Sequence, residues 1–157
     1  MIVKERSSTT QSVPTTSAAE QNLAVIQRFY RALGTNDGSK VVPVLTDDFV
    51  GTVATGMPNG LGGVYHGNEN AVAKIWLRIW SMWYVHGEPT DFLPVDDDRV
   101  VVLGRYVGEA RNGNPAVYAT FAHVFTVRGD RLASLEQITD TAQWLKFPTR
   151  EQAAASR

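Results

Sequence analysis

The sequence predicts an α+β fold in which helices cover one face of a mostly antiparallel sheet. Helical periodicity is confined to the first half of the chain, and segments with strand composition dominate the second half. The chain has 157 residues, of which 43% are hydrophobic, enough to build the core of a single domain.

The first helix is predicted to begin after Ser17, because Ser17–Glu20 matches a capping box. Apolar residues then recur at helical spacing until Gly34 ends the pattern; they are Leu23, Ile26, Phe29, Tyr30 and Leu33. A short second helix is expected over Ser39–Leu45, where Pro43 is tolerated because the segment is brief.

A strand near Asp47–Val50 and a glycine-rich loop over Gly56–Gly63 precede the third predicted helix. That helix is expected to start at Asn68 or Asn70, either of which can cap it, and to end at about Trp83.

The rest of the chain alternates between strands and turns. Strands are predicted over residues 85–94, 100–110, 116–127 and 132–143, with turns at 95–99 and 128–131. Residues 1–17 are expected to form a disordered arm and residues 148–157 a flexible tail. The predicted folded domain is therefore 18–147.

Charge, cysteine content and hydropathy exclude several classes of function. The 15 Lys and Arg side chains are balanced by 16 Asp and Glu, which gives a net charge of −1 and no basic field for nucleic acid. The chain has no cysteine, which excludes disulfides, thiolate metal ligands and cysteine nucleophiles. No apolar run approaches the about 20 residues of a membrane span and no signal peptide is visible, so we expect a cytoplasmic protein without membrane contact.

Five strings occur in a characteristic order: RFYRAL at 28–33, GVYHG at 63–67, VVLGRYVG at 101–108, FAHVFTV at 121–127 and ITDTA at 138–142. Together they resemble SnoaL-like polyketide cyclases and ketosteroid-isomerase-related proteins of the nuclear transport factor two-like superfamily. The resemblance covers about residues 22–144. It implies a cone-shaped α+β barrel, whose strongly curved sheet wraps against three N-terminal helices and encloses one deep pocket. It also implies a homodimer formed through the outer sheet face, and no metal, nucleotide or flavin cofactor.

His123 is the first candidate catalytic residue. It alternates with Phe121 and Phe125, which places it on the apolar, inward face of a strand. A buried imidazole requires hydrogen-bond partners, so His123 is either a core histidine satisfied by backbone or a working group. The resemblance implies a working histidine on this strand.

The last predicted strand carries the second candidate position. The resemblance implies an acidic base about fourteen residues after the histidine, but Gln137 occupies that place and cannot act as a base. A two-residue turn at Gly129 and Asp130 would pair His123 with Glu136, whereas a bulged three-residue turn would pair it with Leu135 and turn Gln137 inward. The family spacing favours the bulged turn, with Gln137 orienting a carbonyl group; in the other register Glu136 would contact the substrate.

Two more side chains are candidates for proton transfer. Asp140 is a possible base near the end of the last strand, or else a carboxylate that anchors the following loop. Tyr65 follows the glycine-rich loop, where its hydroxyl would reach the pocket rim as an acid or oxyanion donor, or else pack at the helix entry.

The third predicted helix has an unusual density of aromatic residues in Trp76, Trp80 and Trp83, followed by Tyr84. This density indicates a cavity for a flat or extended apolar ligand, although such aromatic stripes often simply form the core. The residues expected to bind substrate are Trp76, Trp80, Trp83, Tyr106, Phe121 and Phe49. Three scattered histidines and the consecutive carboxylates Asp96–Asp98 do not suggest a metal site, so no metal is expected.

These observations predict a cofactor-independent cyclase or isomerase that acts on an apolar polyketide-type intermediate in natural-product biosynthesis. A pocket without an inward carboxylate would favour shape-directed, including pericyclic, ring closure over proton abstraction. Three alternatives are a non-catalytic carrier of a hydrophobic small molecule, an epoxide-opening enzyme, and a dimeric interaction module whose cavity is filled.

Overall fold

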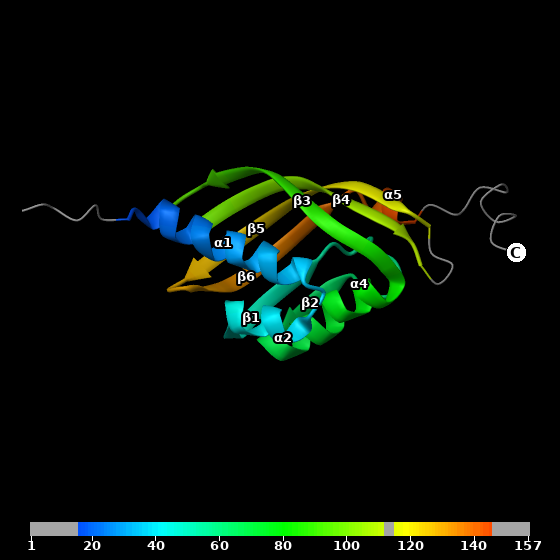
Figure 1. The fold of residues 1–157 in the computed structure, drawn as a ribbon, viewed down its shortest axis with the longest axis horizontal. Helices are drawn as coiled ribbons and strands as arrows, with labels where there is room; N and C mark the ends of the chain where they lie inside the picture. Colours follow the sequence, from blue (N-terminus) through cyan, green and yellow to red (C-terminus); the bar gives the residue numbers. More distant parts are fainter. Residues whose placement is uncertain (1–15, 112–114, 146–157) are drawn as a thin grey trace, which may run out of the picture.

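The computed structural model describes residues 16–111 and 115–145, in which the strands form one six-stranded sheet (Figure 1). The sheet order is β2-β1-β6-β5-β4-β3, and every neighbouring pair is antiparallel except β1 and β6. The bounds are β1 Leu45–Val53, β2 Gly63–His66, β3 Trp83–Pro94, β4 Arg99–Ala110, β5 Val117–Arg128 and β6 Arg131–Thr139. Residues 1–15 of the arm expected over 1–17, and the whole tail expected over 148–157, lie outside the described residues.

Helix α1 (Ala18–Gly34) begins and ends as predicted. The Ser17 hydroxyl accepts a hydrogen bond from the Glu20 amide at 3.2 Å, which satisfies one of the unpaired donors at the helix start. The second predicted helix is divided into α2 (Gly38–Val41) and a 3₁₀ turn η1 (Val42–Val44). The division falls beside Pro43, which has no amide hydrogen to continue an α-helix.

The third helical segment consists of α3 (Asn68–Ala71), a π-helical stretch η2 (Val72–Trp76) and α4 (Leu77–Met82). It ends one residue earlier than predicted, because Trp83 already has extended backbone angles and opens β3. Trp83 therefore does not share a helical stripe with Trp76 and Trp80.

The strand prediction differs from the structure most clearly at β2 and at the end of the last strand. The short strand β2 pairs with β1 where the sequence indicated only a loop and a helix entry. The last strand ends at Thr139 rather than 143, and α5 (Thr141–Trp144) follows. The chain turns there because Trp144, only 1% exposed, folds back against Trp83 with ring centroids 5.2 Å apart.

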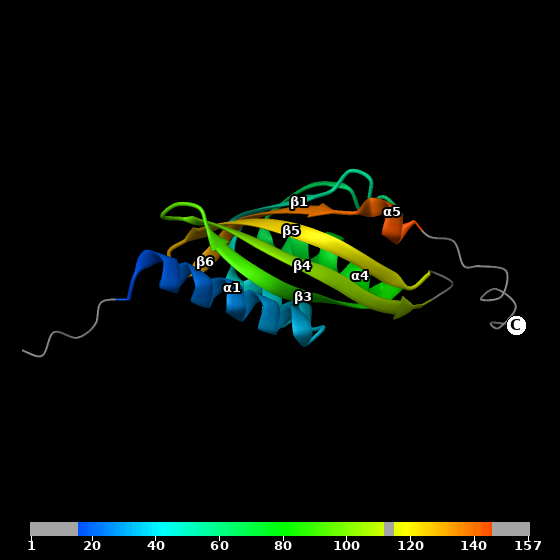
Figure 2. The ribbon, with the colours of Figure 1, turned by 90° about the horizontal axis from the view of Figure 1, so that it is seen from above.

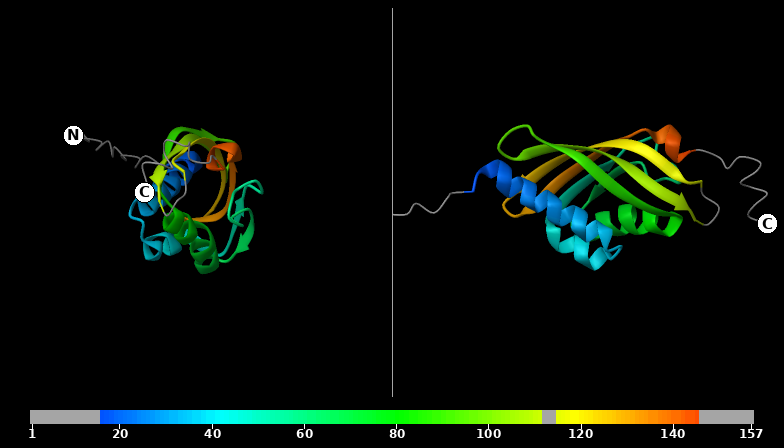
Figure 3. Two further views of the ribbon diagram at one scale, coloured as in Figure 1. Left: turned by 90° about the vertical axis from the view of Figure 1, so that its right-hand side faces the viewer. Right: turned by 45° about the horizontal axis from the view of Figure 1, so that its top comes forward.

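The sheet is bent around the helices, as the end-on view shows (Figure 3, left). Register shifts near Thr90 in β3 and near Ala133 in β6 are β-bulges, which bend and twist the strands that carry them. Strands β3 to β6 lie side by side over α1 and α4 (Figure 2). The predicted α+β fold with a strongly curved, mostly antiparallel sheet is thus confirmed.

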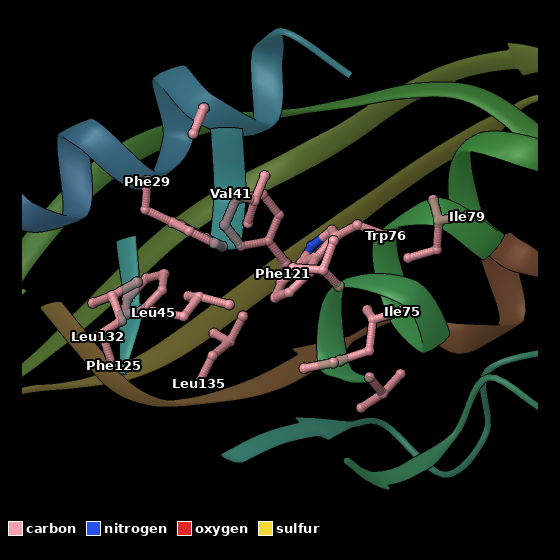
Figure 4. Packing of buried hydrophobic residues seen from close by; sticks show 14 of the residues in the cluster. Phe29, Val41, Leu45, Ile75, Trp76, Ile79, Phe121, Phe125, Leu132 and Leu135 are labelled. Atoms are coloured by element: carbon pink, nitrogen blue, oxygen red, sulfur yellow. The ribbon is translucent and has the colours of Figure 1, made fainter. Parts of the chain in front are cut away.

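The core lies between the concave face of the sheet and the helices, where Phe29, Trp76, Phe121, Phe125 and Leu135 converge (Figure 4). The Phe29 ring contacts both Trp76 and Phe125 edge-on, at centroid distances of 5.5 and 5.6 Å. Across the described residues, no helix combines the length and apolarity that a membrane span requires.

Candidate functional site

A pocket of about 90 Å³ opens within this core, between α1, the η2–α4 segment and the concave sheet face. One wall is helical and apolar, and it is formed by Ile75, Trp76, Ile79 and Trp80. Trp76 is 7% exposed and Trp80 is half-buried, so Trp80 lies nearer the solvent. Both of these tryptophans, expected from the sequence to bind substrate, thus line the pocket.

The opposite side of the pocket carries polar groups among its lining residues, and one of them is His123, with only 4% of its surface exposed. Its Nδ1 is 2.8 Å from the Tyr30 hydroxyl, and its Nε2 is 2.5 Å from the Tyr106 hydroxyl. Neither partner is backbone, so His123 is not the backbone-satisfied core histidine that the sequence left open. Tyr30 comes from α1 and Tyr106 from β4, which ties the helix to the sheet.

Gln137 extends this row of hydrogen bonds along β6. Its Nε2 donates to the Tyr106 hydroxyl at 3.0 Å, and its Oε1 accepts from the Ala54 amide at 3.4 Å. Gln137 is 7% exposed and lines the pocket beside His123. We call Tyr30, His123, Tyr106 and Gln137 the polar chain.

The polar chain is electrically neutral near pH 7. Burial lowers the pKa of the His123 imidazole from 6.5 to about 3, because the protonated ring would lose its hydration. Burial raises the pKa of Tyr30 far above its usual value, and the nearby Tyr106 hydroxyl adds to this shift. Burial likewise raises the pKa of Tyr106, although the hydrogen bond from Gln137 opposes the change.

Phe121 holds the imidazole from outside the pocket. Its ring stacks on His123 with centroids 4.0 Å apart and planes 14° from parallel. Gly104 makes room for it, since a Cβ at that position would approach Phe121 Cζ to 2.5 Å. Phe121 therefore supports a pocket residue instead of lining the pocket as predicted.

The last hairpin has the two-residue turn of one predicted alternative and the inward Gln137 of the other. The turn has two residues, since Arg128 pairs with Arg131, yet His123 pairs with Gln137 rather than with Glu136 or Leu135. The bulge near Ala133, inside the strand and not in the turn, shifts the pairing. Gln137 thus faces inward as the family spacing indicated, but the pairing predicted for either turn is wrong.

The three other candidates for polar contacts lie away from the pocket. Glu136 pairs with Val124 on the outer face and is exposed, because successive strand residues point to opposite faces. Asp140 is exposed ahead of α5 and accepts a hydrogen bond from Gln143 at 3.3 Å. The Tyr65 hydroxyl donates to the Leu61 carbonyl at 2.7 Å, which fixes the glycine-rich loop.

Among the described residues, no carboxylate lines the pocket. Within the same residues, no group of three or more His, Asp or Glu side chains is arranged to hold a metal ion. The consecutive aspartates 96–98 do not form such a group either. The Asp96 carboxylate accepts a hydrogen bond from the guanidinium of Arg99 at 2.7 Å.

Two predicted substrate contacts belong to the core instead. Phe49 is fully buried beside Trp76, with ring centroids 6.3 Å apart, and Trp83 packs against Trp144. Trp144 itself lines the pocket and contacts the Tyr106 ring at 5.1 Å. Sequence reasoning missed Trp144, and it recognised Tyr30 only as part of an apolar helix face.

Comparison with known proteins agrees with this architecture. The sequence matches the SnoaL-like domain family over residues 26–135. No curated protein sequence matches the chain.

Solved structures share the fold over most of their length. A nuclear transport factor two-like protein of unknown function from Burkholderia pseudomallei is 30% identical, with a TM-score of 0.68 over 78% of this chain and 92% of that one. TerC, crystallised with polyporic acid, is 23% identical, with a TM-score of 0.68 over 78% and 93% of the two chains. A candidate polyketide cyclase from Sinorhizobium meliloti is 20% identical, with a TM-score of 0.59 over 73% and 94%.

Proposed function

The chain belongs to the SnoaL-like domain family, a cyclase- and isomerase-type family, and on that premise we propose that it promotes ring closure of an apolar, carbonyl-bearing small molecule in its pocket. The observation that carries the proposal is the neutral polar chain set into a pocket lined mainly by apolar and aromatic side chains. Such a site favours a ligand with a large apolar body and a single oxygen to orient. A highly reduced polyketide-type intermediate, which keeps few oxygens on a long carbon chain, has this character.

The geometry favours shape-directed closure over carboxylate-driven chemistry. A pocket that holds a flexible chain in a folded conformation lowers the entropic part of the barrier to ring formation. A hydroxyl donor that polarises the carbonyl stabilises negative charge as it develops on oxygen. The described pocket lining offers no carboxylate to remove a C–H proton, and both His123 nitrogens are engaged by tyrosines. For the same reason, nothing in the described lining supports epoxide opening.

The second candidate function is reversible binding of a hydrophobic small molecule without turnover. The observation that favours it is the saturation of His123, whose two nitrogens both have tyrosine partners and so provide no free base. Ring closure and binding require the same pocket, and only turnover distinguishes them.

Product analysis with a panel of linear, apolar, carbonyl-bearing polyketide intermediates tests the two functions together. Each compound is incubated with wild-type protein and with Trp80→Ala, and cyclised products are followed by mass spectrometry while tryptophan fluorescence reports binding. Ring closure above the uncatalysed rate supports the enzyme. Saturable quenching without product supports the carrier, and the absence of both would contradict the proposal.

We also propose that the protein forms a homodimer through the outer sheet face. Leu103, Ala122 and Ile138 are register neighbours on β4, β5 and β6, and Leu103 and Ile138 are exposed there. Tyr118, 60% exposed, extends this apolar strip. Light scattering should give a dimer mass for wild type and a monomer mass for Leu103→Glu; a monomeric wild type would refute the dimer.

A further inference from the structure

We propose that the polar chain has a single hydrogen-bond direction, that His123 is the Nδ1–H tautomer, and that the Tyr30 hydroxyl is the donor that recognises an acceptor oxygen of the ligand. Tyr30 then selects a ketone, quinone or enolate oxygen, and Gln137 is a positioning residue that sets the direction. This inference deepens the proposed function and rests on it for the identity of the bound group.

The Ala54 backbone amide fixes the direction of the hydrogen bonds along the polar chain. A backbone amide can only donate, so the Gln137 oxygen must face the Ala54 nitrogen. The Gln137 amino group then faces Tyr106, and because an amide NH₂ can only donate, the Tyr106 oxygen must accept. The single hydroxyl proton of Tyr106 remains available for its other neighbour.

That neighbour is the Nε2 of His123, 2.5 Å away. The buried imidazole is neutral near pH 7, since burial lowers its pKa to about 3, and it therefore carries one N–H and one acceptor nitrogen. If Tyr106 donates to Nε2, the proton of the ring lies on Nδ1. The Nδ1–H then donates to the Tyr30 oxygen across 2.8 Å.

The opposite tautomer fits the surroundings poorly. An Nε2–H would give Tyr106 two donors and leave its own proton without an acceptor among the described residues. The Tyr106 ring is packed by Phe121 and Trp144, with centroids 4.6 and 5.1 Å away, so that proton would be enclosed by aromatic rings. In the proposed direction Tyr106 and the imidazole each accept one hydrogen bond and donate another, and consecutive bonds of this kind strengthen one another.

The polar chain therefore ends in one unused hydrogen-bond donor, the hydroxyl proton of Tyr30. Tyr30 lines the pocket, and no second acceptor for its hydroxyl is found in the described part of the chain. A ligand that brings an acceptor oxygen to this point completes the chain. A ligand that brings only a donor, or nothing polar, leaves the Tyr30 hydroxyl without an acceptor and therefore binds more weakly.

Nitrogen-15 NMR of the histidine side chains tests the direction in the free, full-length protein. We expect His123 Nδ1 to give the protonated signal and Nε2 the unprotonated one. Gln137→Leu removes the donor that orients Tyr106 and should bring the two shifts toward each other, whereas the outward-facing Glu136→Gln should leave them unchanged. An Nε2–H tautomer in wild type would overturn the proposal, and unchanged shifts in Gln137→Leu would remove the positioning role of Gln137.

Acetophenone and ethylbenzene, two probes of similar size, test the recognition. Tryptophan quenching should show tighter binding of acetophenone by wild type, and Tyr30→Phe should reduce the acetophenone preference about tenfold. An equal preference in both proteins, or none in wild type, would overturn the role of Tyr30. These readouts need no turnover, so a failure of the proposed ring closure is recognised separately by the product analysis.

Discussion

The two walls of the pocket bind in different ways. On the polar side, Tyr30 of α1 and the strand residues His123, Tyr106 and Gln137 depend on one another, because each hydrogen bond sets the donor state of the next. On the helical side, Trp76 and Trp80 act through apolar contact area alone. A change in the polar chain should therefore alter which ligand is recognised, whereas a change in the helical wall should alter stability or overall affinity.

The largest expected effect separates the two tryptophans of the helical wall. Trp76→Ala should lower the free energy of unfolding by about 3–5 kcal/mol, because it leaves a cavity against Phe29 and Phe49. Urea unfolding measures this loss. Trp80→Ala is the matched control, and its half-buried ring should cost much less. Equal losses in the two variants would contradict the division of this wall into core and ligand contact.

The second expected effect concerns the polar chain and acid. Unfolded His123 takes up a proton near pH 6.5, whereas the buried ring stays neutral down to about pH 3. The free energy of unfolding should therefore fall as the pH drops below 6.5, approaching about 1.4 kcal/mol per pH unit, and this group should contribute no pH dependence above that range.

Urea unfolding of wild type and His123→Gln between pH 7 and pH 5 measures this contribution. The fall should be smaller in the variant by roughly 2 kcal/mol at pH 5. Parallel curves would mean that the imidazole is not held neutral.

The third expected effect is on affinity. Trp80→Ala should weaken acetophenone binding by about 1–2 kcal/mol, since it removes aromatic contact area at the outer end of the helical wall. Trp80→Ala should weaken ethylbenzene binding equally, because the Trp80 contact is apolar. Quenching titrations with both probes measure the two affinities. A loss confined to acetophenone would show that the two walls are coupled.

The smallest effects are expected at the outward carboxylates. Glu136→Gln and Asp140→Asn should change probe affinity and the free energy of unfolding by no more than about 0.5 kcal/mol, because both side chains are exposed. The same titrations and unfolding curves apply. A large loss of affinity or turnover in Asp140→Asn would return it to the candidate bases.

Alternation along single elements predicted part of the site. The apolar residues around His123 placed it on the inner face, and the structure confirms that position. Helical spacing included Tyr30 among the inward residues of α1, but its hydrogen bond to His123 joins residues 93 positions apart and has no local pattern. The element order likewise predicted the curved sheet.

The remainder depended on tertiary packing. The bulge near Ala133 reflects the pairing of the whole β5–β6 ladder, and neither Ala133 nor its neighbours Leu132 and Ser134 form a local pattern that predicts it. Trp144 was missed because a four-residue helix shows no periodicity and is held in place by its contact with Trp83. The direction of the polar chain depends on a backbone amide at Ala54, which no side-chain pattern reveals.

The pH dependence of acetophenone binding tests most directly the claim that a neutral polar chain recognises the ligand. The dissociation constant would be measured by tryptophan quenching from pH 5 to pH 8.5, in wild type and in His86→Gln, which removes the exposed histidine at the pocket edge. The dissociation constant should change less than about twofold in both proteins, because no group of the polar chain gains or loses a proton in this range. A roughly tenfold change that persists in His86→Gln, or no binding at any pH, would contradict it.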